Sequence, residues 1–178
     1  MSAGIGNDLL SPLGETLLDS ASEHYTALVV PHSAIAPPAL TAARADQLIR
    51  RPLQDQSAGE AMLAGLWLWH DCLEQSHNIS QKLNNPTGSF WHAIMHRREG
   101  DFSNSKYWYA RCKEHSVLRA IASAAENPDG LNASSFVDLV EGVHAERQSS
   151  QHEVAVQLQR LEWRELFSHC ARAAAGVV

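Results

Sequence analysis

The sequence has few of the features that mark disulfide-rich or membrane-spanning proteins. Among its 178 residues are three cysteines, which lie far apart and never in a CxxC spacing. Neither a disulfide framework nor a thiolate zinc site is therefore expected. No uninterrupted apolar run approaches the roughly 18 residues of a membrane helix, and the N-terminus lacks the basic and apolar pattern of a signal peptide. These absences predict a soluble protein of the reducing cytoplasm that makes no membrane contact.

Positive charge is also scarce. Lys and Arg total 14 against 20 Asp and Glu, so the formal net charge is −6, and the basic residues form no block. A general nucleic-acid binder needs a basic surface, so we expect no nucleic-acid partner. The chain also lacks a glycine-rich phosphate loop and a GxSxG sequence. The first absence excludes nucleotide binding through such a loop. The second excludes serine-hydrolase chemistry on a nucleophile elbow.

Strand signals are almost missing, and helical patterns take their place. Prolines concentrate in residues 1–56, which predicts short helices joined by extended connections, near 15–28 and 41–49. Residues 57–178 carry apolar side chains at helical spacing and form the expected main core. Helices are predicted at about 58–83, 89–99, 103–112, 116–125, 134–147 and 153–174. The prediction is a single all-α, bundle-like domain over residues 1–178, with five to seven helices.

Two of the expected helices each carry two histidines and a glutamate at positions i, i+4 and i+7. The sets are His70, Glu74 and His77 on the first helix, and His92, His96 and Glu99 on the second. This spacing places each set on one helix face, and the short connection predicts that the two helices are antiparallel neighbours. The two faces can then meet across one cleft.

A cleft of this kind would suit a divalent metal ion, because imidazole and carboxylate groups are ligands of Zn, Fe and Mn. The predicted ligands are His77, His92 and His96, with Glu74 or Glu99 as a further ligand or general base. The alternative is that carboxylates, backbone groups and water satisfy the histidines and that no metal binds. Ten histidines in the chain produce such spacings by chance, so the sequence leaves both interpretations open.

Hydrogen-bonding and aromatic residues follow the second histidine set around a glycine break. The residues predicted to bind substrate are Arg97, Arg98, Asp101, Asn104, Lys106 and Trp108. Arginine guanidinium groups form two parallel hydrogen bonds with a carboxylate or phosphate, and lysine adds a positive charge. This set of residues therefore suits an anionic ligand. The alternative is an ion-pair network that joins one helix to the next, with the aromatic side chains in the core.

The same stretch resembles a set of small uncharacterised helical proteins of bacteria and fungi that have no established activity. The similarity spans roughly residues 60–112, with a weaker part at Leu161-Glu162-Trp163 and Phe167-Ser168-His169-Cys170. The matching residues are Leu68-Trp69-His70-Asp71, Ser76-His77, Trp91-His92, His96-Arg97-Arg98-Glu99, Asn104, Lys106 and Trp108. The resemblance implies where a shared site would lie, and it implies no reaction.

The sequence therefore suggests a small enzyme with His77, His92, His96 and Glu99 as catalytic residues. The chemistry would be acid–base or metal-assisted, either hydrolysis or isomerisation, on a small polar and anionic molecule. The alternative is a non-catalytic helical module that binds a ligand or a protein and uses the same cluster as a structural network. The oligomeric state is left open.

Overall fold

The computed structural model describes residues 8–20, 25–30, 34–112, 115–124 and 132–177. Within these ranges the chain forms nine α-helices, one short 3-10 helix and no β-strand. The all-α prediction is confirmed, and the predicted five to seven helices are too few. The elements are α1 (Pro12–Asp19), α2 (Pro38–Ala42), η1 (Ala45–Gln47), α3 (Gln56–Trp69), α4 (Leu73–Ser80), α5 (Pro86–Glu99), α6 (Phe102–Arg111), α7 (Ser116–Ala124), α8 (Ala133–Val143) and α9 (Ser150–Ala174). Among the described helices, none combines the length and the apolar character needed to cross a bilayer.

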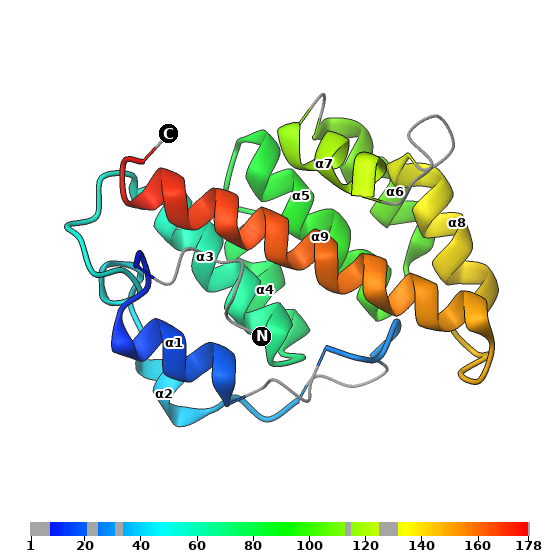
Figure 1. Ribbon diagram of the computed structural model, residues 1–178, viewed down its shortest axis with the longest axis horizontal. Coiled ribbons are helices and arrows are strands. Elements are labelled where there is room, and N and C mark those ends of the chain that lie inside the picture. The colour runs from blue at the N-terminus through cyan, green and yellow to red at the C-terminus, as the bar shows by residue number, and fades with distance from the viewer. Residues whose placement is uncertain (1–7, 21–24, 31–33, 113–114, 125–131, 178) are drawn as a thin grey trace.

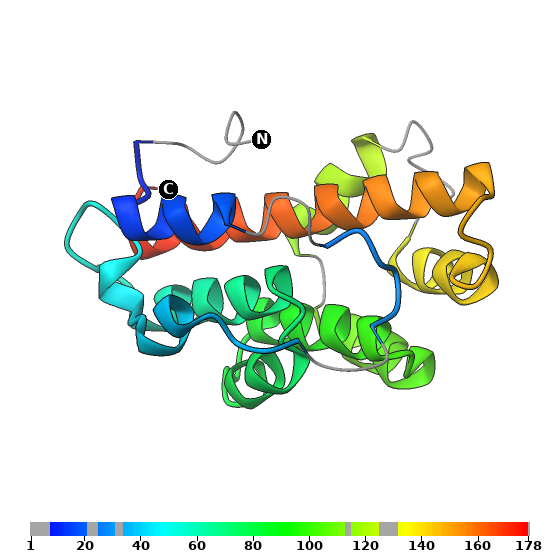
Figure 2. The same ribbon diagram turned by 90° about the horizontal axis from the view of Figure 1, so that it is seen from below.

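The C-terminal helix α9 is the longest element and runs along the whole molecule (Figure 1). It packs against α3, α7 and α8. The view from below shows α9 in one layer and α3, α4, α5 and α6 in a second layer beneath it (Figure 2). In that second layer α5 contacts α3, α4 and α6. Helix α5 therefore lies in the centre of the packing, which explains why it is buried on all sides from Gly88 to Arg98.

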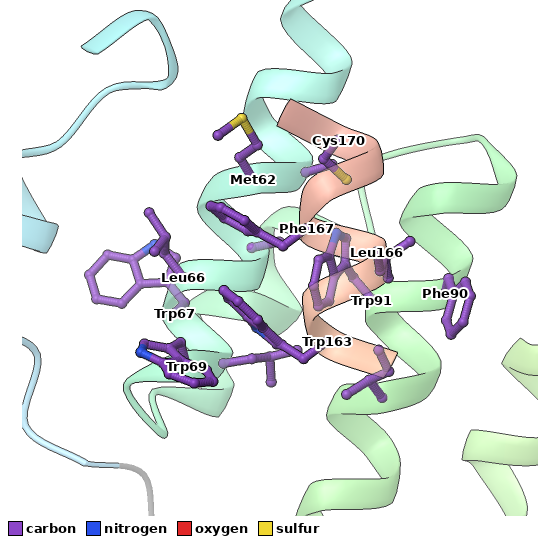
Figure 3. Close-up of a cluster of buried hydrophobic side chains, with 14 of the residues drawn as sticks. Met62, Leu66, Trp67, Trp69, Phe90, Trp91, Trp163, Leu166, Phe167 and Cys170 are labelled. Carbon is purple, nitrogen blue, oxygen red and sulfur yellow. The ribbon is translucent and has the colours of Figure 1, made fainter. Parts of the chain in front are cut away.

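Aromatic side chains join α3, α5 and α9 (Figure 3). Trp163 of α9 stacks on Phe167 with ring centroids 4.7 Å apart, and its indole N–H donates a 2.8 Å hydrogen bond to the carbonyl of Gly65. Gly65 must remain small, because a Cβ atom there would lie 2.7 Å from the Trp91 ring. The close approach of α3 to these rings thus holds the two layers together.

The three cysteines are reduced and buried, as expected for small apolar side chains. Burial is the largest cause that raises the pKa of Cys112 to about 12 and that of Cys170 to about 12. Both thiols therefore stay protonated at neutral pH, and neither offers the thiolate that nucleophilic catalysis requires.

The predicted helix at residues 58–83 is two helices, because the chain turns sharply after α3. Asp71 has a left-handed backbone with φ of 59°. Its N–H donates to the Leu68 carbonyl at 3.0 Å, and the N–H of Cys72 donates to the Trp67 carbonyl at 2.8 Å. These two bonds form a Schellman turn, which usually carries glycine. Aspartate tolerates this conformation better than most residues do, and the Arg98 guanidinium lies 2.8 Å from its carboxylate.

A second turn of the same kind ends α5 and begins α6. Gly100 has φ of 90°, and the N–H of Asp101 donates to the His96 carbonyl at 2.9 Å. The Asp101 side chain then caps α6 by accepting a 3.1 Å hydrogen bond from the N–H of Asn104. This tight corner brings the last residues of α5 and the cap of α6 to the same place.

Candidate functional site

Three histidines from two neighbouring helices converge at one point. His77 comes from α4, whereas His92 and His96 lie one turn apart on α5. One ring nitrogen from each lies within 4.8 Å of the others. The ring centroids are 4.6 Å apart for His77 and His92, 4.7 Å for His92 and His96, and 5.6 Å for His77 and His96. We call these three residues the histidine triad.

The hydrogen bonds of the triad show which nitrogens are engaged. Nδ1 of His96 lies 2.5 Å from a Glu99 carboxylate oxygen, and its Nε2 lies 3.1 Å from the side-chain nitrogen of Asn104. The carboxylate can only accept, so the His96 ring donates from Nδ1, and the tautomer with its one proton there has a lone pair on Nε2. Nδ1 of His92 is buried and has no hydrogen-bond partner within the described chain. The His92 ring stacks on Trp108, with centroids 4.1 Å apart.

Burial keeps two of these rings neutral at physiological pH. Burial first, and then the adjacent His96 and His77, lower the pKa of His92 to about 3. Burial and the neighbouring His96 also lower the pKa of His77. A neutral imidazole is the form that binds a metal ion, so His77 and His92 are held in the protonation state that coordination requires.

An open groove of about 790 Å³ adjoins the triad. Its wall has an apolar part and an acidic part, and His77 belongs both to the groove and to the triad. The lining residues are Val30, Leu73, Glu74, His77, Met95, Glu99, Gly100 and Asp101. A small molecule in the groove would therefore lie beside one of the three imidazoles.

His70 does not belong to the cluster that its spacing predicted. The turn at Asp71 separates it from α4, so the expected stripe of His70, Glu74 and His77 on one helix face does not exist. His70 is buried at the end of α3, where its Nε2 makes a 2.8 Å hydrogen bond to the Leu17 carbonyl. Glu74 lies in the groove wall and is exposed. It is therefore placed to contact a ligand in the groove rather than an ion at the triad.

Arg97 was expected to hold a substrate, and the structure instead places it in the core. It is 0% exposed and pairs with the carboxylate of Glu162 on α9, with further hydrogen bonds to the same group and to the Tyr109 hydroxyl. The Tyr109 hydroxyl donates in turn to Glu162. This closed network ties α5, α6 and α9 together and leaves the guanidinium no access to the groove.

Arg98 is likewise 0% exposed. Its guanidinium donates to the backbone carbonyls of Leu68 at 2.9 Å and Ala27 at 3.1 Å, besides its ion pair with Asp71. It lies 4.0 Å from the ring centroid of Tyr25. Both arginines thus match the ion-pair alternative of the sequence analysis, and the expectation that they bind an anionic substrate has no support from their positions.

The remaining predicted substrate-binding residues divide between the groove and other contacts. Asp101 lines the groove. Asn104 and Trp108 contact His96 and His92, so they hold the triad from the side of α6. Lys106 pairs with Asp138 of α8 at 2.5 Å and is not part of the groove wall.

Sequence reasoning missed the residues that only the fold brings near the site. Glu162 and Tyr109, which engage Arg97, lie 65 and 12 residues from it. The apolar groove residues Val30, Leu73 and Met95 carried no chemical signal. No local pattern around Glu162 pointed to its pairing with Arg97, because the two residues lie 65 positions apart.

A separate buried histidine, His115, precedes α7. It packs against Phe90 and His169, with ring centroids 5.3 Å and 4.8 Å away. Nδ1 accepts from the Val117 N–H at 3.3 Å, so Nε2 carries the proton in its 3.2 Å hydrogen bond to the Thr87 hydroxyl. Burial, and then the neighbouring His169, lower the pKa of His115 to about 4.

This shift predicts acid destabilisation. The unperturbed pKa is 6.5, so between about pH 6.5 and 4 the unfolded chain binds a proton that the folded chain does not. The contribution of His115 to the free energy of unfolding should therefore fall as the pH drops through this range, by about 3 kcal/mol at full effect. Urea denaturation from pH 7.5 to 4.5 measures it. His115→Gln should make the profile less steep by the share of His115 and leave the share of His92 and His77, with His144→Gln as the control. An unchanged profile in His115→Gln would contradict the assignment.

No family model, curated protein or solved structure matches this chain, so the candidate site is interpreted from its own geometry.

Proposed function

We propose that the chain is a hydrolase that depends on a divalent metal ion held by His77, His92 and His96. The observation that carries this proposal is the convergence of three imidazole nitrogens within 4.8 Å, beside an open groove. Three protein ligands with a free fourth position are the ligand set of catalytic zinc sites. Imidazole also suits zinc better than it suits Mg²⁺ or Ca²⁺, which take oxygen ligands.

The triad needs only a small adjustment to hold the ion. Nitrogens bound tetrahedrally to zinc at about 2.0–2.1 Å lie about 3.3 Å apart, so nitrogens that lie within 4.8 Å of one another would approach by at most about 1.5 Å. The Asn104 amide would release the Nε2 lone pair of His96. Glu99 already accepts from Nδ1 of that ring, which is the carboxylate–histidine arrangement that orients metal ligands and raises their basicity.

Hydrolysis fits the surroundings better than isomerisation does. A divalent ion supplies Lewis acidity and lowers the pKa of a bound water. Glu74 and Asp101 line the same groove as His77, and a carboxylate there can accept a proton from a water molecule. The groove is open to solvent, which supplies that water, whereas reactive isomerisation intermediates are usually protected from it.

Cobalt binding to the purified, untagged chain tests the metal site. We expect one Co²⁺ per chain with the visible absorption of four-coordinate cobalt. His77→Ala, His92→Ala and His96→Ala should each lose that absorption, because two imidazoles hold the ion far more weakly than three. His144→Ala, which removes a histidine at the end of α8, should retain it. Binding that persists unchanged in all three triad variants would show that the triad is not the site.

Turnover tests the second half of the proposal. The zinc- or cobalt-loaded chain should hydrolyse at least one member of a panel of small esters, amides and phosphoesters, and the triad variants should not. A metal-loaded chain without turnover would instead support a structural metal site.

A non-catalytic helical module is the second candidate, and the hydrogen bonds of His96 favour it, because Glu99 and Asn104 satisfy this ring without an ion. In that case His96→Ala would cost about 1–3 kcal/mol of stability and leave the metal content unchanged.

A further inference from the structure

We infer that the groove beside the triad selects a substrate with a positively charged group, such as an ammonium or guanidinium, rather than an anion. This inference rests on the proposed function and adds the substrate class. Three of the eight described residues that line the groove are carboxylates, namely Glu74, Glu99 and Asp101, and none of these eight is lysine or arginine. The wall thus has the charge that repels the anionic ligand expected from the sequence.

The three carboxylates are not equally available. Glu99 is engaged by Nδ1 of His96 at 2.5 Å. Asp101 uses one oxygen, Oδ1, to accept from the N–H of Asn104 and the hydroxyl of Ser103. These bonds leave Oδ2 of Asp101 and the exposed carboxylate of Glu74 for a ligand.

The arginines closest in sequence cannot neutralise this surface. Arg97 is committed to Glu162 and Arg98 to Asp71, and both are fully buried. Within the described chain, neither Glu74 nor Asp101 forms an ion pair with lysine or arginine.

The polarity of the groove then orients the substrate. A divalent ion held by His77, His92 and His96 would supply positive charge at that end of the groove, which would favour the oxygen of the bond to be hydrolysed, because that oxygen gains negative charge during the reaction. The charged end of the substrate lies against Glu74 and Asp101, where an ammonium or guanidinium forms charge-assisted hydrogen bonds. Val30, Leu73 and Met95 provide an apolar surface for the carbon chain between the two ends.

Three hydroxamates of equal chain length, ending in an ammonium, a methyl or a carboxylate group, test this inference on the cobalt-loaded chain. The hydroxamate binds the metal in all three, so only the far end differs. Visible absorption of Co²⁺ gives each dissociation constant. We expect the ammonium compound to bind about tenfold more tightly than the carboxylate compound, with the methyl compound between them, at low salt. The preference should shrink in 0.5 M salt, because screening weakens interactions between exposed charges.

Variants assign the effect to the two carboxylates. Glu74→Gln and Asp101→Asn should each reduce the preference to less than threefold, and Glu74→Lys should reverse it. Asparagine retains the capping ability of Asp101, so the fold is preserved. Glu146→Gln removes an exposed carboxylate outside the groove and should keep the full preference. Equal or reversed affinities with bound cobalt would overturn the substrate class and leave the metal site intact, whereas absence of cobalt binding would overturn the proposed function and this inference together.

Discussion

Replacing Glu162 by glutamine is expected to lower the free energy of unfolding by about 3–5 kcal/mol, the usual cost of breaking a buried ion pair by removing one partner. The carboxylate is 1% exposed and accepts hydrogen bonds from both Arg97 and Tyr109. Glutamine keeps the shape but leaves the Arg97 charge without a counter-charge in the core. Urea denaturation at neutral pH measures the loss.

Two controls separate the buried charge from other effects of the substitution. Glu165→Gln lies on the same helix and breaks an exposed pair with Arg164, so we expect a change within about 0.5 kcal/mol. The double variant Arg97→Met/Glu162→Leu removes both charges and should be clearly more stable than Glu162→Gln alone. A single variant as stable as the wild type would mean that the two charges do not meet in the core.

Zinc is expected to stabilise the chain by about 2.7 kcal/mol when its free concentration is 100 times the dissociation constant. For a chain of this size the melting temperature should rise by about 5–10 °C. The reason is that the triad exists only in the folded chain, since His77 and His92 come from different helices. Differential scanning calorimetry with zinc measures the shift, and His92→Ala should abolish it. An equal shift in that variant would place the metal elsewhere.

The variant Glu99→Gln tests, by the same calorimetric measurement, how much Glu99 contributes to zinc binding. Removing the carboxylate that accepts from His96 should weaken zinc binding about 10–100-fold, the usual effect of losing an outer-shell partner. At the zinc concentration that stabilises the wild type by about 2.7 kcal/mol, this variant should gain only about 0.4–1.4 kcal/mol. Glu146→Gln should behave as the wild type does.

Local patterns predicted most of the helices. Helix α5 was expected at 89–99 and lies at Pro86–Glu99, and α9 was expected at 153–174 and lies at Ser150–Ala174. These helices were predictable because their caps and apolar spacing depend on residues within a few positions of one another. For the same reason the spacing of His92 and His96 on one face was readable from the sequence. Their meeting with His77 followed only from the assumption that α4 and α5 are neighbours, which the structure bears out.

The errors occurred where distant residues decide the local structure. The turn at Asp71 carries no glycine, and its left-handed backbone is accompanied by an ion pair with Arg98, 27 positions away. Arg97 and Arg98 were expected to bind an anionic ligand in a pocket wall, with an ion-pair network between helices as the alternative. Their burial depends on Glu162 and Asp71, and no periodicity within α5 reveals those partners.

By itself, the sequence determined the helical class and the pairing of His92 with His96, because helix geometry follows from interactions over three or four residues. The tertiary structure decided which charges face the groove and which lie in the core. It placed Arg97 against the buried carboxylate of Glu162 and Arg98 against the half-buried carboxylate of Asp71, and it left Glu74 and Asp101 in the groove wall with His77. The physical reason is that a buried charge needs a partner, and the crossing of α5 with α9 and with the end of α3 supplies it only in the folded chain.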